Sequence, residues 1–453
     1  MAKQKMLSLV LIGVMLAGTV LVGCGPKATE VVTVAPKVTT VPPAKPVVIT
    51  LWHLENLDYR VAAYQKLADD FHAQNPDVTV NIEVQSWADG QPKLLAASQS
   101  GTLPDISQAS ASMTLTMWQT GALQPVDSIV EAIDAQQTYA SVNLRDKFDK
   151  WDTHYWAVPV WSQSIMLYYR DDLFKAAGIQ TPPATWAELL ADAKLLTGNG
   201  VYGIGIPGKK AMYTDEVTHA FMHTNGVQIF DAQGKVVLNS PEMIQTLEFY
   251  KQLAAYSSPD TPTMDWAEAE NNFATGLVTM NMFFGNIIDR VRKDNPAWAS
   301  SVKSMPVPVR DIGDNQGTET FVIQMMVTSQ DPAKYAASQR FLEFMMEPAN
   351  YIPWLVAMGG GTTFLPVTNT GMQAPEFLNN EVVKKYWASV QTELDASARA
   401  EFYGFYYGPN ADIGPVNGNN IIAEVFQKVL LGEMTPEEAA AWGQQEIITA
   451  IAK

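Results

Sequence analysis

Apolar and polar positions after residue 46 alternate between the periods of a strand and of a helix. Val47–Trp52 is a continuous apolar, β-branched run, which predicts a strand buried on both faces. Apolar residues then recur at helical spacing within Tyr64–Phe71, and Val78–Val84 alternates strictly, as a second strand does. A helix around Lys93–Ser100 and a strand entry at Leu103–Ile106 follow. This β-α-β-α-β order favours a parallel sheet with crossover helices.

Several later helix starts are marked by capping residues. Thr185 and Glu188, like Thr435 and Glu438, have the spacing of a capping box. Ser240–Pro241 and Asp331–Pro332 place a capping side chain before a proline at the first helical position. The chain beyond the N-terminal region is long enough for two domains.

The N-terminal region has the pattern of an export signal. Lys3 and Lys5 precede the apolar stretch Leu7–Val22, which is too short and too glycine-broken for a membrane span. The run Leu21–Cys24 resembles the bacterial lipoprotein cleavage box and contains the only cysteine of the chain. The resemblance implies a signal peptide over residues 1–23 and lipid, including palmitate, on Cys24. An ordinary signal peptide cut elsewhere remains the alternative.

Composition changes again between the export signal and the first strand. Residues 24–47 are rich in Val, Thr and Pro, which predicts an extended linker between the lipid and a globular domain. The formal net charge of the whole chain is −17, and such acidity excludes nucleic acid and anionic membrane surfaces as partners. A single cysteine cannot form an internal disulfide, so the fold depends on its core.

Five motifs spread over the chain resemble those of one family, the extracellular solute-binding proteins of ABC importers, in the sugar-binding group that includes maltose-binding protein. The matching stretches are Ile49–Trp52, Ser100–Ile106, Leu167–Phe174, Pro182–Trp186 and Leu431–Ala439. The resemblance implies a periplasmic-binding-protein-like α/β fold of two α/β lobes joined by a hinge, with a ligand cleft between them. It assigns residues 48–160 and 311–362 to lobe 1, and residues 161–310 and 363–453 to lobe 2.

The same resemblance implies how such a protein works. A ligand that touches both lobes shifts the population toward the closed form. The expected partners are a small carbohydrate, ABC permease subunits with their ATPase, and the membrane through the lipid on Cys24. We expect a monomer at the extracellular face of the cytoplasmic membrane, with no enzymatic activity, cofactor or metal.

Candidate ligand-binding residues are aromatic plates and polar side chains in loops near the carboxyl ends of parallel strands. In lobe 1 these are Trp52, Glu55, Asn56, Trp87, Asp89, Gln108 and Ser110. At the hinge and in lobe 2, the resemblance adds Trp161, Gln163, Met212, Tyr213, Phe284, Asn286, Phe364, Tyr406 and Tyr407. The family's Gly-x-Trp motif is absent at Phe283–Ile287. Replacing Trp161 by Ala is expected to lower affinity and leave unliganded stability nearly unchanged.

Three alternatives stay open from the sequence. The same fold could bind a polyamine, a peptide or a glycerol-phosphate-type compound, although eight arginines in the whole chain favour neutral or weakly cationic cargo. The tyrosine pairs Tyr168–Tyr169 and Tyr406–Tyr407 suit ferric iron, and His219 with His223 has a zinc-like spacing. A carbohydrate-active enzyme would need two suitably spaced carboxylates, and no nucleophile motif is present.

Overall fold

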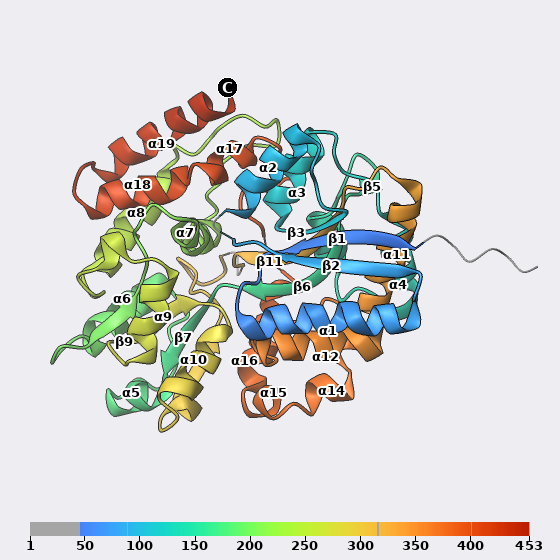
Figure 1. Ribbon diagram of the computed structural model, residues 1–453. Coiled ribbons are helices and arrows are strands. Elements are labelled where there is room, and N and C mark those ends of the chain that lie inside the picture. Colours follow the sequence, from blue (N-terminus) through green and yellow to red (C-terminus); the bar gives the residue numbers. More distant parts are fainter. Residues whose placement is uncertain (1–45, 88, 315–316, 400, 453) are drawn as a thin grey trace, which may run out of the picture. The chain divides into compact units, whose positions relative to one another are not determined.

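Two β-sheets organise the chain in the computed structural model, which describes residues 46–452 except 88, 315–316 and 400 (Figure 1). The predicted signal peptide, Cys24 and nearly all of the predicted linker lie outside the described residues. The two sheets with their covering helices give two α/β lobes, as the sequence predicted. No helix of the described part of the chain is long and apolar enough to cross a membrane.

The first lobe contains a five-stranded sheet among the described residues, in the order β2-β1-β3-β11-β6. Strands β1 (Val47–His53), β2 (Val78–Val84) and β3 (Ile106–Ala109) are parallel, as predicted. Strands β11 (Thr320–Val327) and β6 (Val158–Ser164) add antiparallel neighbours from later in the chain. The sheet is therefore mixed, and its parallel part brings the ends of β1, β2 and β3 to one edge.

Strand β1 is buried on one face only, so the prediction of burial on both faces is wrong. Ile49 and Leu51 are fully buried, and they belong to the same core cluster as the apolar face of α1 (Asp58–Gln74). On the opposite face Val48 is 47 % exposed. A continuous apolar run shows that either face of a strand can be buried. Tertiary packing decides whether helices cover one face or both.

The predicted helix starts are confirmed by their capping geometry. Thr185 and Thr435 each form a complete capping box, at the starts of α6 (Trp186–Leu196) and α19 (Pro436–Ile451). Ser240 and Asp331 accept hydrogen bonds from the first turns of helices that begin at Pro241 and Pro332. The remaining helices of the first lobe and the hinge are α2 (Gly90–Ser100), α3 (Ala111–Gln119), α4 (Asp127–Gln137), α11 (Pro332–Met346), α12 (Pro348–Gly359), α13 (Asn369–Met372), α14 (Pro375–Leu378), α15 (Glu381–Lys385) and α16 (Trp387–Ser397).

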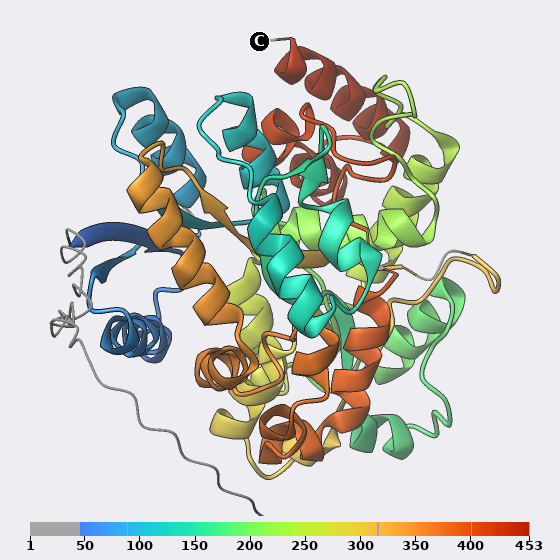
Figure 2. The same cartoon turned by 90° about the vertical axis from the view of Figure 1, so that its right-hand side faces the viewer.

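The second lobe contains a four-stranded sheet among the described residues, in the order β10-β7-β9-β8. Its strands are β10 (Val302–Met305), β7 (Met166–Arg170), β9 (Val278–Phe283) and β8 (Tyr202–Gly205). Helices α18 and α19 pack on α7 and α8, which brings the C-terminal red helix beside the yellow-green part of the chain in Figure 2. The helices of this lobe are α5 (Asp171–Ala176), α6, α7 (Met212–Thr224), α8 (Pro241–Ala254), α9 (Trp266–Ala274), α10 (Asn286–Asp294), α17 (Ile413–Gly418), α18 (Ile421–Leu430) and α19.

The chain passes between the lobes where β6 runs into β7. Strand β6 pairs with β11 as far as Ser164, four residues beyond the expected lobe boundary at 160. The Ser164 hydroxyl lies 2.6 Å from that of Thr320 and 2.9 Å from that of Ser397. The Ile165 N–H donates to the Glu319 carbonyl at 2.9 Å. We propose that Ile165 is the first crossing and that Trp161 and Gln163 belong to the first sheet.

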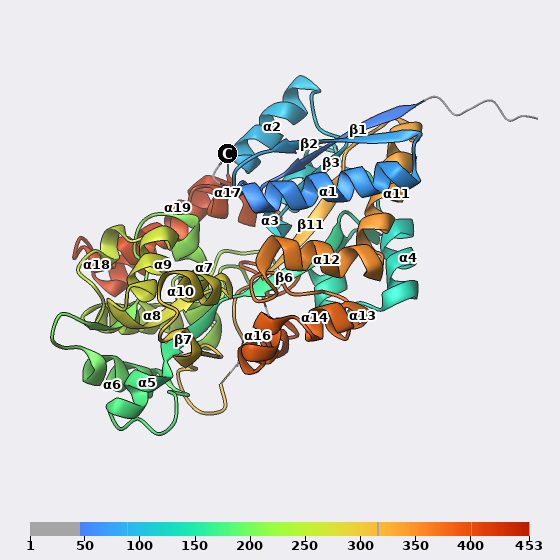
Figure 3. The same cartoon turned by 60° about the horizontal axis from the view of Figure 1, so that its bottom comes forward.

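A later crossing also differs from the expected boundary at residue 362. Helix α12 packs on α1, and α13 packs on α4, so the chain stays with the first lobe beyond residue 362. Helix α16 contacts both β6 and β10, α17 packs on α3 as well as on α19, and α18 and α19 lie with the second lobe (Figure 3). We propose that this crossing lies between α14 and Glu401, whose carbonyl accepts the Thr320 N–H at 3.1 Å.

Candidate functional site

Glu55, just past the end of β1, is the centre of a polar network. Its side chain is buried, with 2 % of the residue exposed. One carboxylate oxygen accepts the indole N–H of Trp87 at 3.0 Å and the amide of Gln108 at 3.2 Å. The other oxygen pairs with the Arg60 guanidinium at 2.6 Å. Three of the predicted residues are thus brought together, because β1, β2 and β3 end at the same edge of the sheet.

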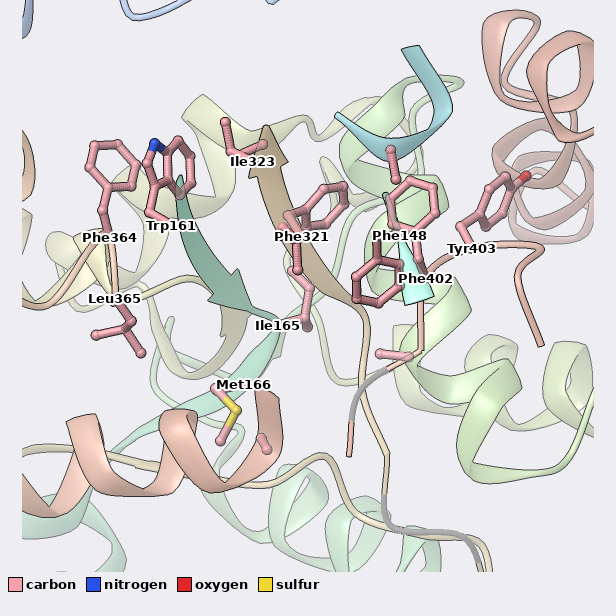
Figure 4. Close-up of a cluster of buried hydrophobic side chains, with 14 of the residues drawn as sticks. Phe148, Trp161, Ile165, Met166, Phe321, Ile323, Phe364, Leu365, Phe402 and Tyr403 are labelled. Atoms are coloured by element: carbon pink, nitrogen blue, oxygen red, sulfur yellow. The ribbon is translucent and has the colours of Figure 1, made fainter. Parts of the chain in front are cut away.

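Arg60 links this network to the aromatic residues of the hinge. Its guanidinium lies 4.6 Å from the centre of the Phe364 ring, and its Nε donates to the Met358 carbonyl at 3.1 Å. The Phe364 ring lies 4.1 Å from that of Trp161, and Figure 4 shows the two side by side. Trp161 is 1 % exposed, and its indole N–H has no partner among the described residues. This burial overturns the expectation that Trp161→Ala would leave unliganded stability unchanged.

The register of β6 and β11 defines an aromatic face around Trp161. Trp161 pairs with Ile323 and Gln163 pairs with Phe321, so these four side chains point to the same side of the sheet. Trp161, Phe321 and Ile323 are shown in Figure 4. The centre of the Phe321 ring lies 5.9 Å from that of Phe284, which belongs to the second lobe. Gln163 is half-buried, so its amide lies at the margin of this face.

Phe284 and Asn286 bring the second lobe to the same place. Asn286 donates to the Glu270 carboxylate at 2.8 Å, and Arg290 lies 3.4 Å from that carboxylate. Burial raises the pKa of Glu270, and the charges of Arg290 and Arg60 oppose that rise. Arg60 therefore lies within electrostatic range of Glu270 across the two lobes. The Arg60 guanidinium is thus balanced by Glu55, and the Glu270 carboxylate by Arg290 and Asn286.

Tyr213 is part of the core of the second lobe rather than of an open loop. It lies in the first turn of α7 and is 3 % exposed, and its ring packs on Phe283 at 5.4 Å. Its hydroxyl donates to the Met282 carbonyl. Met212, by contrast, is 42 % exposed. No contact of the described residues joins either side chain to the Glu55 network.

Four further candidates of the first lobe lie outside the network. Trp52 donates its indole N–H to Glu83 of the neighbouring strand at 2.7 Å, which places it on the sheet surface. Ser110 caps α3 by accepting the Met113 N–H at 3.4 Å. Asn56 and Asp89 are exposed. These four stay predictions that no contact in the structure supports.

The tyrosine pair near the C-terminus is also exposed. Tyr406 is 45 % exposed and Tyr407 is 55 % exposed, with ring centres 5.0 Å apart. The Tyr407 hydroxyl donates to Gln228 at 3.0 Å. The pair offers apolar ring faces at the surface of the second lobe.

Sequence reasoning missed three residues that the structure brings to this junction. Arg60 follows Glu55 by five positions, and that spacing near a strand end was the signal available for it. Glu270 lies within α9, and Phe321 lies within an apolar strand. Nothing in their local sequence separates them from ordinary helix and strand positions.

The chain is similar to known bacterial proteins over most of its length. A family model described as bacterial extracellular solute-binding protein matches residues 56–352. The chain is 25 % identical over 397 residues to YcjN of Escherichia coli K12, whose name describes an ABC transporter periplasmic-binding protein. That alignment covers 85 % of this chain and 89 % of YcjN.

Two solved structures show the same fold. Maltose-bound MalE3 of T. maritima superposes with a TM-score of 0.75 at 18 % identity, covering 89 % of this chain and 100 % of MalE3. An ABC transporter solute-binding protein of Thermotoga lettingae TMO, bound with α-D-tagatose, superposes with a TM-score of 0.74 at 21 % identity. That match covers 89 % of this chain and 99 % of the other.

Proposed function

This chain belongs to the family of bacterial extracellular solute-binding proteins, and from that premise we propose that it captures an extracellular carbohydrate and delivers it to an ABC permease. It is a substrate-binding protein of an ABC transporter, as the match to YcjN over most of both chains indicates. The carbohydrate, the hinge closure and the lipid anchor are the proposed parts.

One observation carries the choice of carbohydrate: Arg60, the positive charge beside the aromatic faces, is already balanced by Glu55. Glu55 neutralises Arg60 at 2.6 Å, while Trp161, Phe321 and Phe364 supply ring surfaces at the same place. An anionic ligand would have to compete with Glu55 for the one guanidinium. A polyhydroxylated solute needs only hydrogen bonds and an apolar plate. The maltose and tagatose bound to the two similar folds agree with this choice.

The proposed mechanism is capture by closure around the ligand. The Glu55 network lies on the first lobe, and Phe284 with Asn286 lies on the second. A ligand that touches both lobes binds the closed form more tightly, so it shifts the population toward closure. The permease then distinguishes the loaded protein from the empty one by its conformation.

A thermal-shift panel of mono- and oligosaccharides tests the proposal. A ligand at 100 times its Kd adds about 2.7 kcal/mol to the free energy of unfolding, which raises the melting temperature. X-ray scattering on the same samples should show a smaller radius of gyration with a ligand that binds. If no carbohydrate raises the melting temperature and the scattering never changes, the proposal is wrong. Turnover of an oligosaccharide beyond one equivalent would instead indicate an enzyme.

Gln163→Ala locates the site, because Gln163 is half-buried on the face that carries Trp161 and Phe321. We expect weaker carbohydrate affinity by isothermal titration calorimetry with an unchanged unliganded melting temperature. Gln65→Ala on the exposed side of α1 is the matched control and should leave affinity unchanged. Equal affinity in both variants would move the site away from this face.

We also propose that Cys24 carries the membrane anchor. Two or more acyl chains are needed for stable anchoring, since one chain holds a protein only marginally. Mass spectrometry of the full chain from a bacterial membrane fraction should show a diacylated N-terminal cysteine. Cys24→Ala should move the protein to the soluble fraction, and retention in the membrane would contradict the proposal.

A further inference from the structure

Three buried carboxyl groups, a histidine and a tyrosine lie near the starts of α7 and β11. Asp215 and Glu216 lie in the first turns of α7, and Glu319 lies just before β11. The exposed fractions are 2 % for Asp215, 8 % for Glu216 and 0 % for Glu319. Tyr403 is 3 % exposed, and its ring stands edge-on to His219 at 5.4 Å. We call Asp215, Glu216, His219, Glu319 and Tyr403 the acidic cluster.

The polar atoms of the acidic cluster are only partly satisfied by the protein. Glu319 is hydrogen-bonded to His219 and accepts the Tyr403 N–H at 3.3 Å. Asp215 accepts the Ala423 N–H with one oxygen, and its other oxygen has no partner among the described residues. The Tyr403 hydroxyl likewise has no described partner, although it is buried. Within the described part of the chain, Glu216 makes neither a hydrogen bond nor an ion pair, although it keeps some contact with solvent.

The two lysines near the acidic cluster are paired with other carboxylates. Lys147 is paired with Glu401, and Lys210 is paired with Glu424 at 2.6 Å. Among the described residues, no lysine or arginine forms an ion pair with a carboxyl of the acidic cluster. Burial raises the pKa of Asp215, Glu216 and Glu319, and neighbouring carboxylates raise all three further. The charge of Lys210 opposes the rise only for Asp215. An uncompensated buried carboxylate is unfavourable, so a cation at this place would stabilise the cluster.

The acidic cluster lies where the two lobes meet. Glu319 hydrogen-bonds the first crossing through Ile165. Phe402, beside Tyr403, contacts Phe321 of the proposed site at 5.6 Å. In Figure 4 the Tyr403 hydroxyl points away from the neighbouring phenylalanines. Phe402 is therefore the residue that connects the cluster to the proposed carbohydrate site.

The segment above Asp215 joins the lobes a second time. Ala423 lies in α18, directly after α17, and α17 packs on α3 of the first lobe. Asn417 of α17 donates to the Ser112 hydroxyl at 3.2 Å. Helices α17 and α18 thus connect Asp215 with the first lobe.

We propose that the acidic cluster binds a protonated amino group on the ligand, so the solute is an amino sugar or an amino alditol. An ammonium group presents three donors, and the unpartnered oxygens of Asp215 and Tyr403 are the acceptors we assign to it, with Glu216 as a further negative charge nearby. The sugar hydroxyls and ring would lie toward Phe321 and Trp161.

This inference rests on the proposed function, and matched ligand pairs separate the two. The probes are glucose with glucosamine, galactose with galactosamine, and sorbitol with 1-amino-1-deoxysorbitol, each measured by calorimetry near neutral pH. We expect the amine of at least one pair to bind about tenfold or more tightly than its neutral partner, as a hydrogen bond to a charged group allows. Neutral members that bind as well as their amines overturn the inference and leave the proposed function standing. Binding by none of the six compounds, with no thermal shift across the carbohydrate panel, overturns both.

Glu216→Gln tests the cluster itself. Because Glu216 has no described partner, we expect this variant to fold with an unliganded melting temperature equal to or above that of the wild type. It should lose the preference for the amine and keep the neutral sugar's affinity within about twofold. Glu248→Gln, on an exposed position of α8, removes the same charge and should change neither value. Equal weakening of amine and neutral sugar by Glu216→Gln contradicts the inference.

Tyr403→Phe is a second, independent variant. It keeps the ring packed on His219 and removes only the unpartnered hydroxyl. We expect a reduced preference for the amine with a nearly unchanged melting temperature. An unchanged preference in this variant together with Glu216→Gln would show that the amino group binds elsewhere.

Discussion

Replacing Glu55 by Gln tests the network on which the proposed site depends. Glu55 accepts hydrogen bonds from Arg60, Trp87 and Gln108 while it is 2 % exposed. Glutamine keeps the size of the side chain and one acceptor oxygen, but it removes the negative charge. Arg60, whose side chain is 15 % exposed, would keep its positive charge without the carboxylate that neutralises it.

The expected loss of stability follows from the burial of both partners. Removing one partner of a buried ion pair costs about 3 to 5 kcal/mol. Arg60 retains the Met358 carbonyl at 3.1 Å, the Tyr59 hydroxyl at 3.2 Å and the face of the Phe364 ring. These contacts and the partial exposure of its side chain reduce the cost, so we expect about 2 to 3 kcal/mol for Glu55→Gln.

Urea unfolding at neutral pH measures this loss as a lower midpoint at constant slope. The double variant Glu55→Gln with Arg60→Met removes the unpaired charge and should recover part of the lost stability, a coupling of about 1 kcal/mol or more. Sulfate should stabilise the Glu55→Gln single variant more than the wild type, because it can pair with the freed guanidinium.

Two outcomes would refute this reasoning. A loss below about 0.5 kcal/mol for Glu55→Gln would mean that Arg60 is solvated and not held by the network. Strictly additive single and double variants would mean that the two side chains do not interact in solution.

Three other predictions follow from packing, pH linkage and capping. Trp161→Ala should cost about 3 to 5 kcal/mol in the unliganded protein, because its 1 % exposed ring packs on Phe364, and a stable unliganded variant in urea would contradict this. Burial raises the pKa of Glu393 to about 8, so the folded state holds a proton that the unfolded state releases near pH 4.5. Stability should therefore fall as pH rises from about 4.5 to 8, and Glu393→Gln should flatten that slope; parallel profiles would exclude Glu393 as the cause. Thr435→Ala breaks a complete capping box and should cost about 1 kcal/mol by thermal unfolding, whereas no change would show that α19 is held by packing alone.

The sequence by itself determined the local elements of this protein. The capping boxes at Thr185 and Thr435 were predictable because donor and acceptor lie within four positions of each other. The strand and helix periods of residues 47–109 were predictable because an apolar face must repeat along its own element. Glu55 and Trp87 could be chosen as candidates because residues at the ends of parallel strands share one edge.

Only the tertiary structure decided which side chains meet. Arg60 contacts the Phe364 ring, and its charge acts on the pKa of Glu270. The local sequences of these residues do not indicate that they meet. The burial of Tyr213 likewise depends on Phe283, a residue of another strand. Such contacts depend on strand order and on where the chain crosses between lobes, and a repeating apolar pattern specifies neither. The position of β11 beside β6, which brings Phe321 to Trp161, is the clearest case.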